Sequence, residues 1–139
     1  MSPAFLLDTN ILAEPLRPVP NPAIMLKLKE FESQLAIPAV VWHEMWFGCH
    51  RLQQSPRRKA IEKYLLEVVV PSMPILPYDT AASEYHAEER ARLSLLGKTP
   101  SFADGQIAAI AHANGLTVVT LNLSDFQEFR DLQIEDWQA

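Results

Sequence analysis

Short apolar runs punctuate the chain and are separated by longer segments with apolar residues at helical spacing. Residues 4–7, 35–37, 75–76 and 116–121 predict four short buried strands, and residues 132–134 predict a last strand at the sheet edge. The run at 116–121 has the strongest strand character, because its centre, VVT, is β-branched.

Capping residues and prolines set the ends of the predicted helices. Asn21 followed by Pro22 is a helix start, Asp79 or Thr80 is a second, and Ser101 is a third whose helix ends at Gly115. The predicted helices span residues 10–16, 22 to about 33, 39–52, 56–69, 80–96 and 101–114, with a turn or short helix at 124–130.

Strands that alternate with helices indicate a parallel sheet covered on both faces. We therefore expect one domain, residues 1–139, with a three-layer α/β/α sandwich and a central, mainly parallel sheet of about five short strands. Sites in such folds lie at the carboxyl ends of the strands. Asp8 and Asn122 both come just after predicted strand ends.

Composition narrows the class of protein. Of the 139 residues 48% are hydrophobic, which argues against a disordered chain, and no apolar run approaches the length of a membrane span. The N-terminus lacks the pattern of a signal peptide, and the single cysteine, Cys49, allows no internal disulfide, so we expect a cytoplasmic protein without a membrane. The net charge of -5 argues against a general nucleic-acid binder, unless acidic residues gather in a metal site.

Four carboxylates occupy positions that need an explanation: Asp8, Glu44, Asp104 and Asp125. Glu44 lies in AVVWHEMWFGC, a helix that is predicted to be buried all round, where an unpaired carboxylate is costly. Each also has a structural explanation: a partner arginine for Glu44, a capping box with Ser101 for Asp104, and turns for Asp8 and Asp125. Gathered together, the four would repel one another and would need a cation such as Mg²⁺ or Mn²⁺, which prefer oxygen ligands.

Four ordered motifs carry a resemblance to a known family. They are LLDTNIL at 6–12, EMWFG at 44–48, ADGQIAAIA at 103–111 and VTLNLSDF at 119–126, followed by IEDW at 134–137. Together they resemble the PIN-domain nucleases, most closely the VapC-type toxins of bacterial toxin–antitoxin pairs. The resemblance covers essentially the whole chain.

The resemblance implies a metal-dependent endoribonuclease whose metal-activated water attacks an RNA phosphodiester in line. It places the catalytic quartet on Asp8, Glu44, Asp104 and Asp125, with the metal (Mg²⁺ or Mn²⁺) on Asp8, Asp104 and Asp125 and with Thr9 and Asn122 as supporting polar residues. Many relatives have a basic residue shortly before the last acid, where this chain has Leu121, Leu123 and Ser124, so either Asp125 or Asn122 is the stronger fourth contact. The implied partners are an RNA substrate, a cognate VapB-like antitoxin and often a second copy of the chain.

Other interpretations stay open at this point. A receiver-like signalling domain also gathers aspartates at strand ends, and Asp79 could stand for its phosphoacceptor, but no lysine follows Lys98. A non-catalytic RNA-binding PIN module is expected to have lost an acid, and none is missing.

Trp42 and Trp46, one helical turn apart, belong to the core or form a partner-binding ridge. We expect the antitoxin to occupy an apolar groove along this helix and to place a basic side chain near the acids. The basic residues that could hold RNA phosphates are Arg51, Arg57, Arg58, Lys59, Arg90, Arg92 and Lys98.

Overall fold

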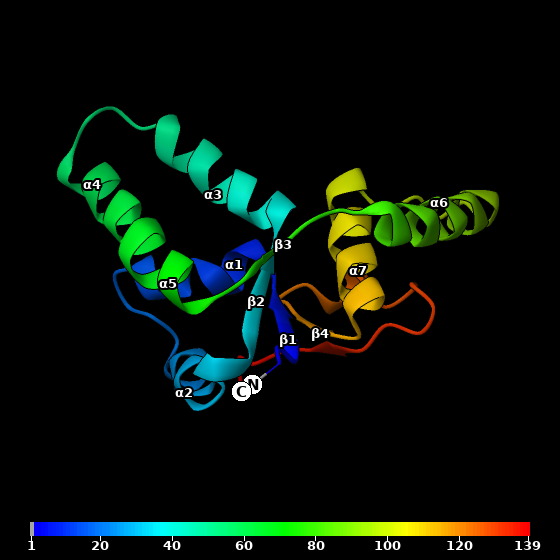
Figure 1. Ribbon diagram of the computed structural model, residues 1–139, viewed down its shortest axis with the longest axis horizontal. Coiled ribbons are helices and arrows are strands. Elements are labelled where there is room, and N and C mark those ends of the chain that lie inside the picture. The colour runs from blue at the N-terminus through cyan, green and yellow to red at the C-terminus, as the bar shows by residue number, and fades with distance from the viewer. Residues whose placement is uncertain (1) are drawn as a thin grey trace.

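The structure is a computed structural model that describes residues 2–139. Five parallel strands form its centre (Figure 1). The strand order is β3-β2-β1-β4-β5. The strands are β1 (Phe5–Leu7), β2 (Leu35–Pro38), β3 (Ile75–Leu76), β4 (Thr117–Val119) and β5 (Ile134–Glu135). Helices lie to either side of them, with α3 to α5 on one side and α6 and α7 on the other. The predicted three-layer α/β/α class is confirmed, and every strand pair is parallel.

The helices begin where the sequence places caps. The side chains of Asn21, Asp79 and Ser101 each accept a backbone N–H in the first turn of the helix that follows, and Gly115 ends its helix at φ 65°. The α-helices are α1 (Thr9–Leu12), α2 (Pro22–Glu30), α3 (Ala39–His50), α4 (Pro56–Lys63), α5 (Val70–Ser72), α6 (Thr80–Leu95) and α7 (Phe102–Asn114). The shorter turns are the 3₁₀ helices η1 (Glu14–Leu16), η2 (Glu32–Gln34) and η4 (Leu123–Asp125) and the π-helix η3 (Tyr64–Val69). No helix within residues 2–139 is long and apolar enough to cross a membrane.

Two predicted helices differ from the regular α-helices that the sequence suggested. The helix expected at 10–16 divides into α1 and η1, with Pro15 inside η1. The helix expected at 56–69 instead runs from α4 through the π-helix η3 into α5, where Pro71 lies. Proline has no N–H and clashes with the carbonyl four residues earlier, and the wider π turn relieves that clash.

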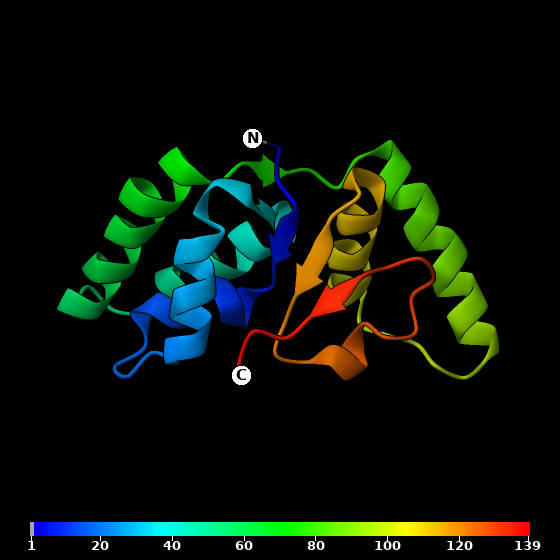
Figure 2. The same cartoon turned by 90° about the horizontal axis from the view of Figure 1, so that it is seen from below.

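The register of the sheet brings two strand ends level with each other. In the pairing of β1 with β4, Leu7 is opposite Val119, and the Asp8 amide donates to the Val119 carbonyl at 3.0 Å. Figure 2 shows β1, β4 and β5 running side by side in the same direction. Leu6, Leu7 and Val118 are fully buried, so the sheet is covered on both faces.

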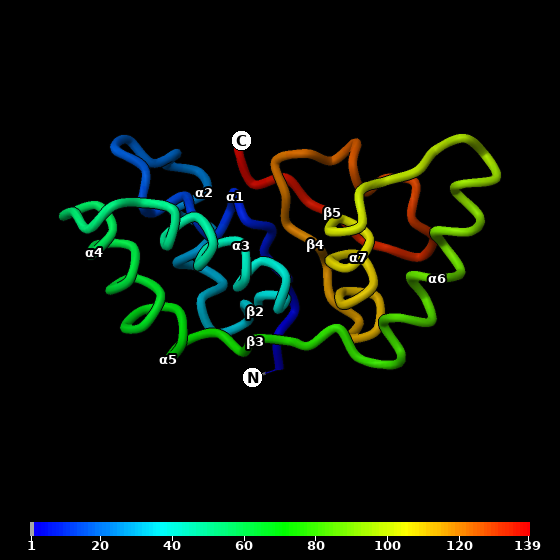
Figure 3. The backbone as a smooth tube through the Cα atoms, turned by 90° about the horizontal axis from the view of Figure 1, so that it is seen from above, coloured from blue at the N-terminus to red at the C-terminus, as the bar shows by residue number. Residues whose placement is uncertain are grey.

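The C-terminal segment closes one side of the core. The chain ends on the side of the sheet to which the strands point, opposite the N-terminus (Figure 3). Trp137 is buried, with its ring centre 5.2 Å from that of Phe5 and 5.8 Å from that of Phe31. Aromatic packing of this kind anchors the segment after β5 against Phe5 of β1 and Phe31 at the end of α2.

Candidate active site

Asp8 is the most deeply placed carboxylate of the predicted site. It follows β1 directly, caps α1 and is only 8% exposed. The Thr9 amide donates to its Oδ1 at 2.8 Å, and the Thr120 hydroxyl donates to its Oδ2 at 2.8 Å. Burial raises the pKa of Asp8 above its usual value, the two hydrogen bonds oppose that rise, and the charge of Asp125 adds to it.

Thr120 is a site residue that sequence reasoning missed. It is fully buried, and besides donating to Asp8 its hydroxyl accepts the Asn122 amide at 3.0 Å. The signal was in the strand register, because Leu7 pairs with Val119 and the next residue on each strand is therefore Asp8 and Thr120. Thr120 orients Asp8 and at the same time shapes the turn that carries Asn122.

Asp104 lies in the first turn of α7. Its amide donates to the Ser101 hydroxyl at 3.1 Å, which is the cap that the sequence predicts. Burial raises the pKa of Asp104, a hydrogen bond with Ser101 lowers it, and the charges of Asp125 and Asp8 raise it further. A capping role and a place in the acidic cluster are therefore compatible.

The residue after Asp104 explains how tightly this turn is held. Gly105 faces His86 of α6, and a Cβ at Gly105 would collide with the His86 ring, whose Cδ2 would lie only 2.6 Å away. His86 is buried and contacts the Tyr78 hydroxyl through Nδ1 at 2.8 Å. Glycine at this position lets α6 pack directly against the turn that presents Asp104.

Asp125 lies at the solvent-exposed rim, in η4. Together with Asp104 it lines a cavity of about 390 Å³, whose wall also includes Lys98, Ser124 and Glu128. Asn122 is exposed, and Thr9 is half-buried beside Asp8. The structure thus brings the predicted Asp8, Asp104 and Asp125 together from β1, α7 and the segment after β4.

Glu44 lies apart from these three, and the prediction that its helix is buried all round is wrong. Its side chain is 46% exposed, and its Oε1 lies 3.6 Å from Nδ1 of the exposed His43, an ion pair only when that histidine is protonated. Only the face of α3 with Val41, Met45 and Cys49 is buried. Glu44 lines a second groove of about 360 Å³, which it shares with Thr9.

The negative charge of Asp125 raises the pKa of Asp8, and the charges of Asp125 and Asp8 raise that of Asp104. The charged groups that act on Asp8 and Asp104 are other carboxylates, and no cation is among them. Such an all-oxygen set suits Mg²⁺ or Mn²⁺, which would remove the mutual repulsion. Within residues 2–139, no group of three or more carboxylate, histidine or cysteine side chains is arranged so that it could hold a metal ion.

Comparison with known proteins decides the family. Residues 5–132 match the family model of the PIN domain. The chain belongs to the PIN-domain family. The toxin FitB of Neisseria gonorrhoeae is 32% identical to this PIN domain over 88% of the chain and 90% of its own length. A tRNA(fMet)-specific endonuclease VapC of Shigella flexneri is 29% identical over 96% of this chain and 97% of its own.

Solved structures agree with this assignment. The FitAcB crystal structure from Neisseria gonorrhoeae superposes with a TM-score of 0.85 at 30% identity, covering 94% of this chain and 95% of the other. DNA-bound VapBC from Salmonella typhimurium superposes with a TM-score of 0.83 at 28% identity, covering 97% and 98%. The predicted resemblance to VapC-type toxins is confirmed, and so, at the level of the family, is the prediction of an endoribonuclease. Membership of the PIN-domain family sets the receiver-like alternative aside.

Proposed function

We propose that this PIN-domain protein is the ribonuclease toxin of a toxin–antitoxin pair and that it hydrolyses RNA at the cluster of Asp8, Asp104 and Asp125. The observation that carries the proposal is the effect of these carboxylates on one another. The charges of Asp125 and Asp8 add to the effect of burial and raise the pKa of Asp104, and no cation is among the groups that act on it. Carboxylates left in this state are ready to take a divalent cation.

The residues for Mg²⁺ or Mn²⁺ would be Asp8, Asp104 and Asp125, with Asn122 as the alternative fourth contact. Thr9 and Thr120 fix both oxygens of Asp8, so Asp8 supplies an oriented oxygen from the buried side. Asp104 and Asp125 would close on the ion from the cavity side. When bound, such an ion lowers the pKa of a coordinated water and offsets charge on the phosphate.

Glu44 stays in the proposed quartet as a catalytic residue without a metal contact. It lines the same groove as Thr9, whose amide donates to Asp8, so this groove connects Glu44 to a residue next to the proposed metal site. From there it can accept a proton or a hydrogen bond from a group that enters between the two cavities.

The basic residues available for RNA are fewer than the sequence indicated. The Arg92 guanidinium is bonded to Glu89 at 2.8 Å, and that of Arg58 is bonded to Glu62 at 3.0 Å. Lys98 is also paired, with Glu128 at 3.4 Å, but its side chain is 55% exposed and lines the cavity of Asp104 and Asp125. We therefore propose that Lys98 contacts a phosphate next to the cleaved bond. This contact would supply salt-dependent affinity without choosing a sequence.

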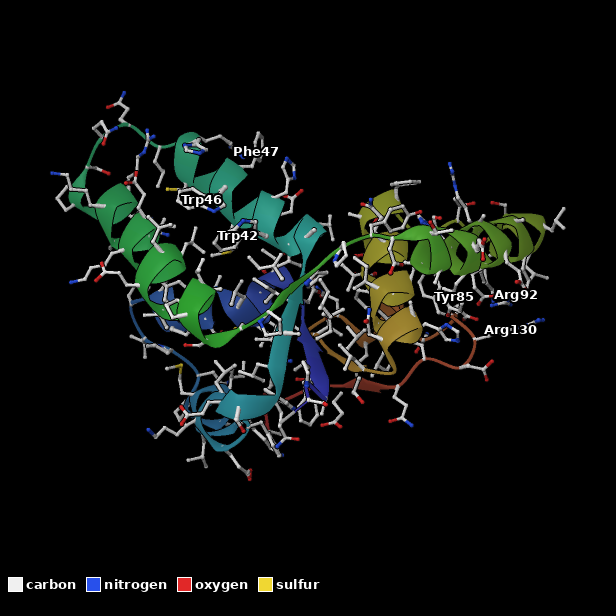
Figure 4. All side chains as sticks on the ribbon, in the orientation of Figure 1. Trp42, Trp46, Phe47, Tyr85, Arg92 and Arg130 are labelled. Atoms are coloured by element: carbon white, nitrogen blue, oxygen red, sulfur yellow. The ribbon has the colours of Figure 1, made fainter. Side chains whose placement is uncertain are left out.

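A VapB-like antitoxin is the proposed partner, and α3 is its proposed docking surface. Phe47 is 50% exposed, and the half-buried Trp42 and Trp46 rings meet edge to face at 5.8 Å (Figure 4). Anchors of this kind dominate interface energies. The groove beside Glu44 would admit a basic antitoxin side chain, and the aromatic surface would also serve a homodimer. We place the activity in the cytoplasm, where RNA is available.

A cleavage assay tests the proposal. Purified protein is incubated with total RNA in Mn²⁺, in Mg²⁺ and in EDTA, beside Asp8→Asn prepared identically. We expect metal-dependent cleavage by the parent and none by Asp8→Asn. Cleavage that persists in Asp8→Asn, or in EDTA, would contradict the proposed chemistry.

A further inference from the structure

The segment that follows β4 carries Asp125, and side chains of α6 hold its main chain. Glu89, only 3% exposed, accepts the Arg130 amide through Oε1 at 2.7 Å. The Tyr85 hydroxyl donates to the Arg130 carbonyl at 2.7 Å. The backbone N–H and C=O of Arg130 are therefore both bonded to side chains of α6. Figure 4 shows Tyr85 and Arg92 of this helix near Arg130.

Arg92 extends the same network toward the cavity. It donates to both carboxylate oxygens of Glu89, at 3.0 and 2.8 Å, and also to the Glu128 carbonyl at 2.7 Å. Lys98 reaches the Glu128 side chain at 3.4 Å. Glu128 lines the cavity that holds Asp104 and Asp125, so the network ends at the wall of the proposed site.

Tyr85 also joins this network to α7, the helix of Asp104. Its ring stacks on His112 with 4.0 Å between ring centres and 13° between planes. One side chain therefore contacts the helix that presents Asp104 and bonds the segment that presents Asp125. Tyr85 thus links α7 at His112 to the segment after β4 at Arg130.

A buried ion pair is weak evidence for a stabilising role, because apolar replacements of similar volume are often equally stable. The pair of Glu89 and Arg92 has a further feature. Both side chains also bond the main chain of one short stretch, residues 128–130. We propose that Tyr85, Glu89 and Arg92 are positioning residues that hold the segment after β4 so that Asp125 can reach a metal ion shared with Asp8 and Asp104. The inference rests on the proposed function.

The chain contains its own matched control. Glu14 is also buried, is paired with the arginine three residues later, Arg17, at 3.2 Å, and accepts a loop amide, that of Asn21, at 2.9 Å. It holds the loop before α2 rather than the segment of Asp125. Glu14→Gln therefore removes the same kind of interaction from a different loop.

The test compares Glu89→Gln, Tyr85→Phe and Glu14→Gln with the parent. Mn²⁺ affinity is measured by electron paramagnetic resonance, and hydrogen exchange is followed in peptides covering residues 122–131. We expect Glu89→Gln to weaken Mn²⁺ binding about tenfold, as loss of a residue supporting metal ligands does. Tyr85→Phe, which keeps the ring on His112, should weaken it roughly threefold to fivefold, the effect of one neutral hydrogen bond. Both should speed exchange in 122–131, and Glu14→Gln should change neither measurement.

The outcomes separate the two proposals. Parental Mn²⁺ affinity in Tyr85→Phe and Glu89→Gln would overturn the positioning role alone, as would an equal loss in Glu14→Gln. If Glu89→Gln does not fold, Tyr85→Phe decides by itself. A parent that binds no Mn²⁺ and cuts no RNA would overturn the proposed function and this inference together.

Discussion

Replacing Asp104 with asparagine tests whether Asp104 is a metal ligand or only supports the start of its helix. The Asp104 amide is bonded to Ser101 and survives the change, so the loss at the helix start is the dipole contribution, about 0.3–1 kcal/mol. This loss is opposed by a gain, because the neutral asparagine is no longer repelled by the charges of Asp8 and Asp125. Two unit charges about 4 Å apart in an effective dielectric near 20 interact by about 4 kcal/mol, and the repulsion falls as their separation grows. Without metal, the variant should be as stable as the parent or more stable by on the order of 1 kcal/mol, a rise of about 3–5 °C in Tm.

Bound metal should reverse this order of stability, so that the parent becomes more stable than Asp104→Asn. A parent at 100 times its Kd gains about 2.7 kcal/mol from binding, whereas Asp104→Asn should gain little. Thermal melts in EDTA and in saturating Mg²⁺ or Mn²⁺, with cleavage of total RNA, measure both effects. Asp79→Asn is the control, because Asp79 caps α6 by accepting the Ala82 amide at 2.9 Å. A variant of Asp104 that melts lower in EDTA, keeps the metal-induced rise and still cuts RNA would refute the reasoning.

The remaining predictions address the groups around this cluster. Thr120→Val should leave an oxygen of Asp8 without its hydrogen-bond donor and so raise the Asp8 pKa further. Denaturant titrations should show a loss of about 1–3 kcal/mol in unfolding free energy. Thr120→Ser keeps the hydroxyl and should restore both the pKa and the stability. Burial raises the Asp8 pKa, so without metal the free energy of unfolding should fall as pH rises from about 3.8 through the raised value, and the Tm gain from Mn²⁺ should grow over the same range. Trp46→Ala in a folded protein should weaken antitoxin binding in calorimetry by roughly 2 kcal/mol. Gly105→Ala should cost about 3 kcal/mol or more, because its Cβ meets the buried His86.

Each of these has an outcome that would count against it. A parental pH profile in Thr120→Val would mean that the hydroxyl does not act on Asp8. A metal-induced rise in Tm that is independent of pH would place the ion on other groups. Unchanged antitoxin affinity in Trp46→Ala would move the docking surface elsewhere, and a stable Gly105→Ala would show that α6 can shift away from α7.

Local signals predicted most of the fold. The caps at Asn21, Asp79 and Ser101 are each made by one side chain and the turn beside it, so sequence alone could place them. The interruption at η3 depends on how the chain accommodates Pro71, and sequence did not indicate that this would be a π turn.

The site was predicted as far as it rests on motifs. The charges of Asp8, Asp104 and Asp125 act on one another, and their role as metal ligands stays a prediction. Thr120 joins Asp8 through strand pairing, which is a tertiary property. The burial of the Glu44 helix was misjudged for a different reason. An apolar helix such as α3 can be buried by the core or kept for a partner, and composition does not distinguish the two.

If the three aspartates hold the ion as proposed, their graded burial would give it a route. Asp125 is exposed at the rim, Asp104 is half-buried, and Asp8 lies at the bottom with both oxygens already bonded. A cation arriving from solvent would meet Asp125 first and give up its waters in steps, ending at the one carboxylate that cannot turn toward it. Departure would follow the reverse path, so exchange of the ion would be governed at the rim, where an antitoxin side chain or a bound RNA could close the way out.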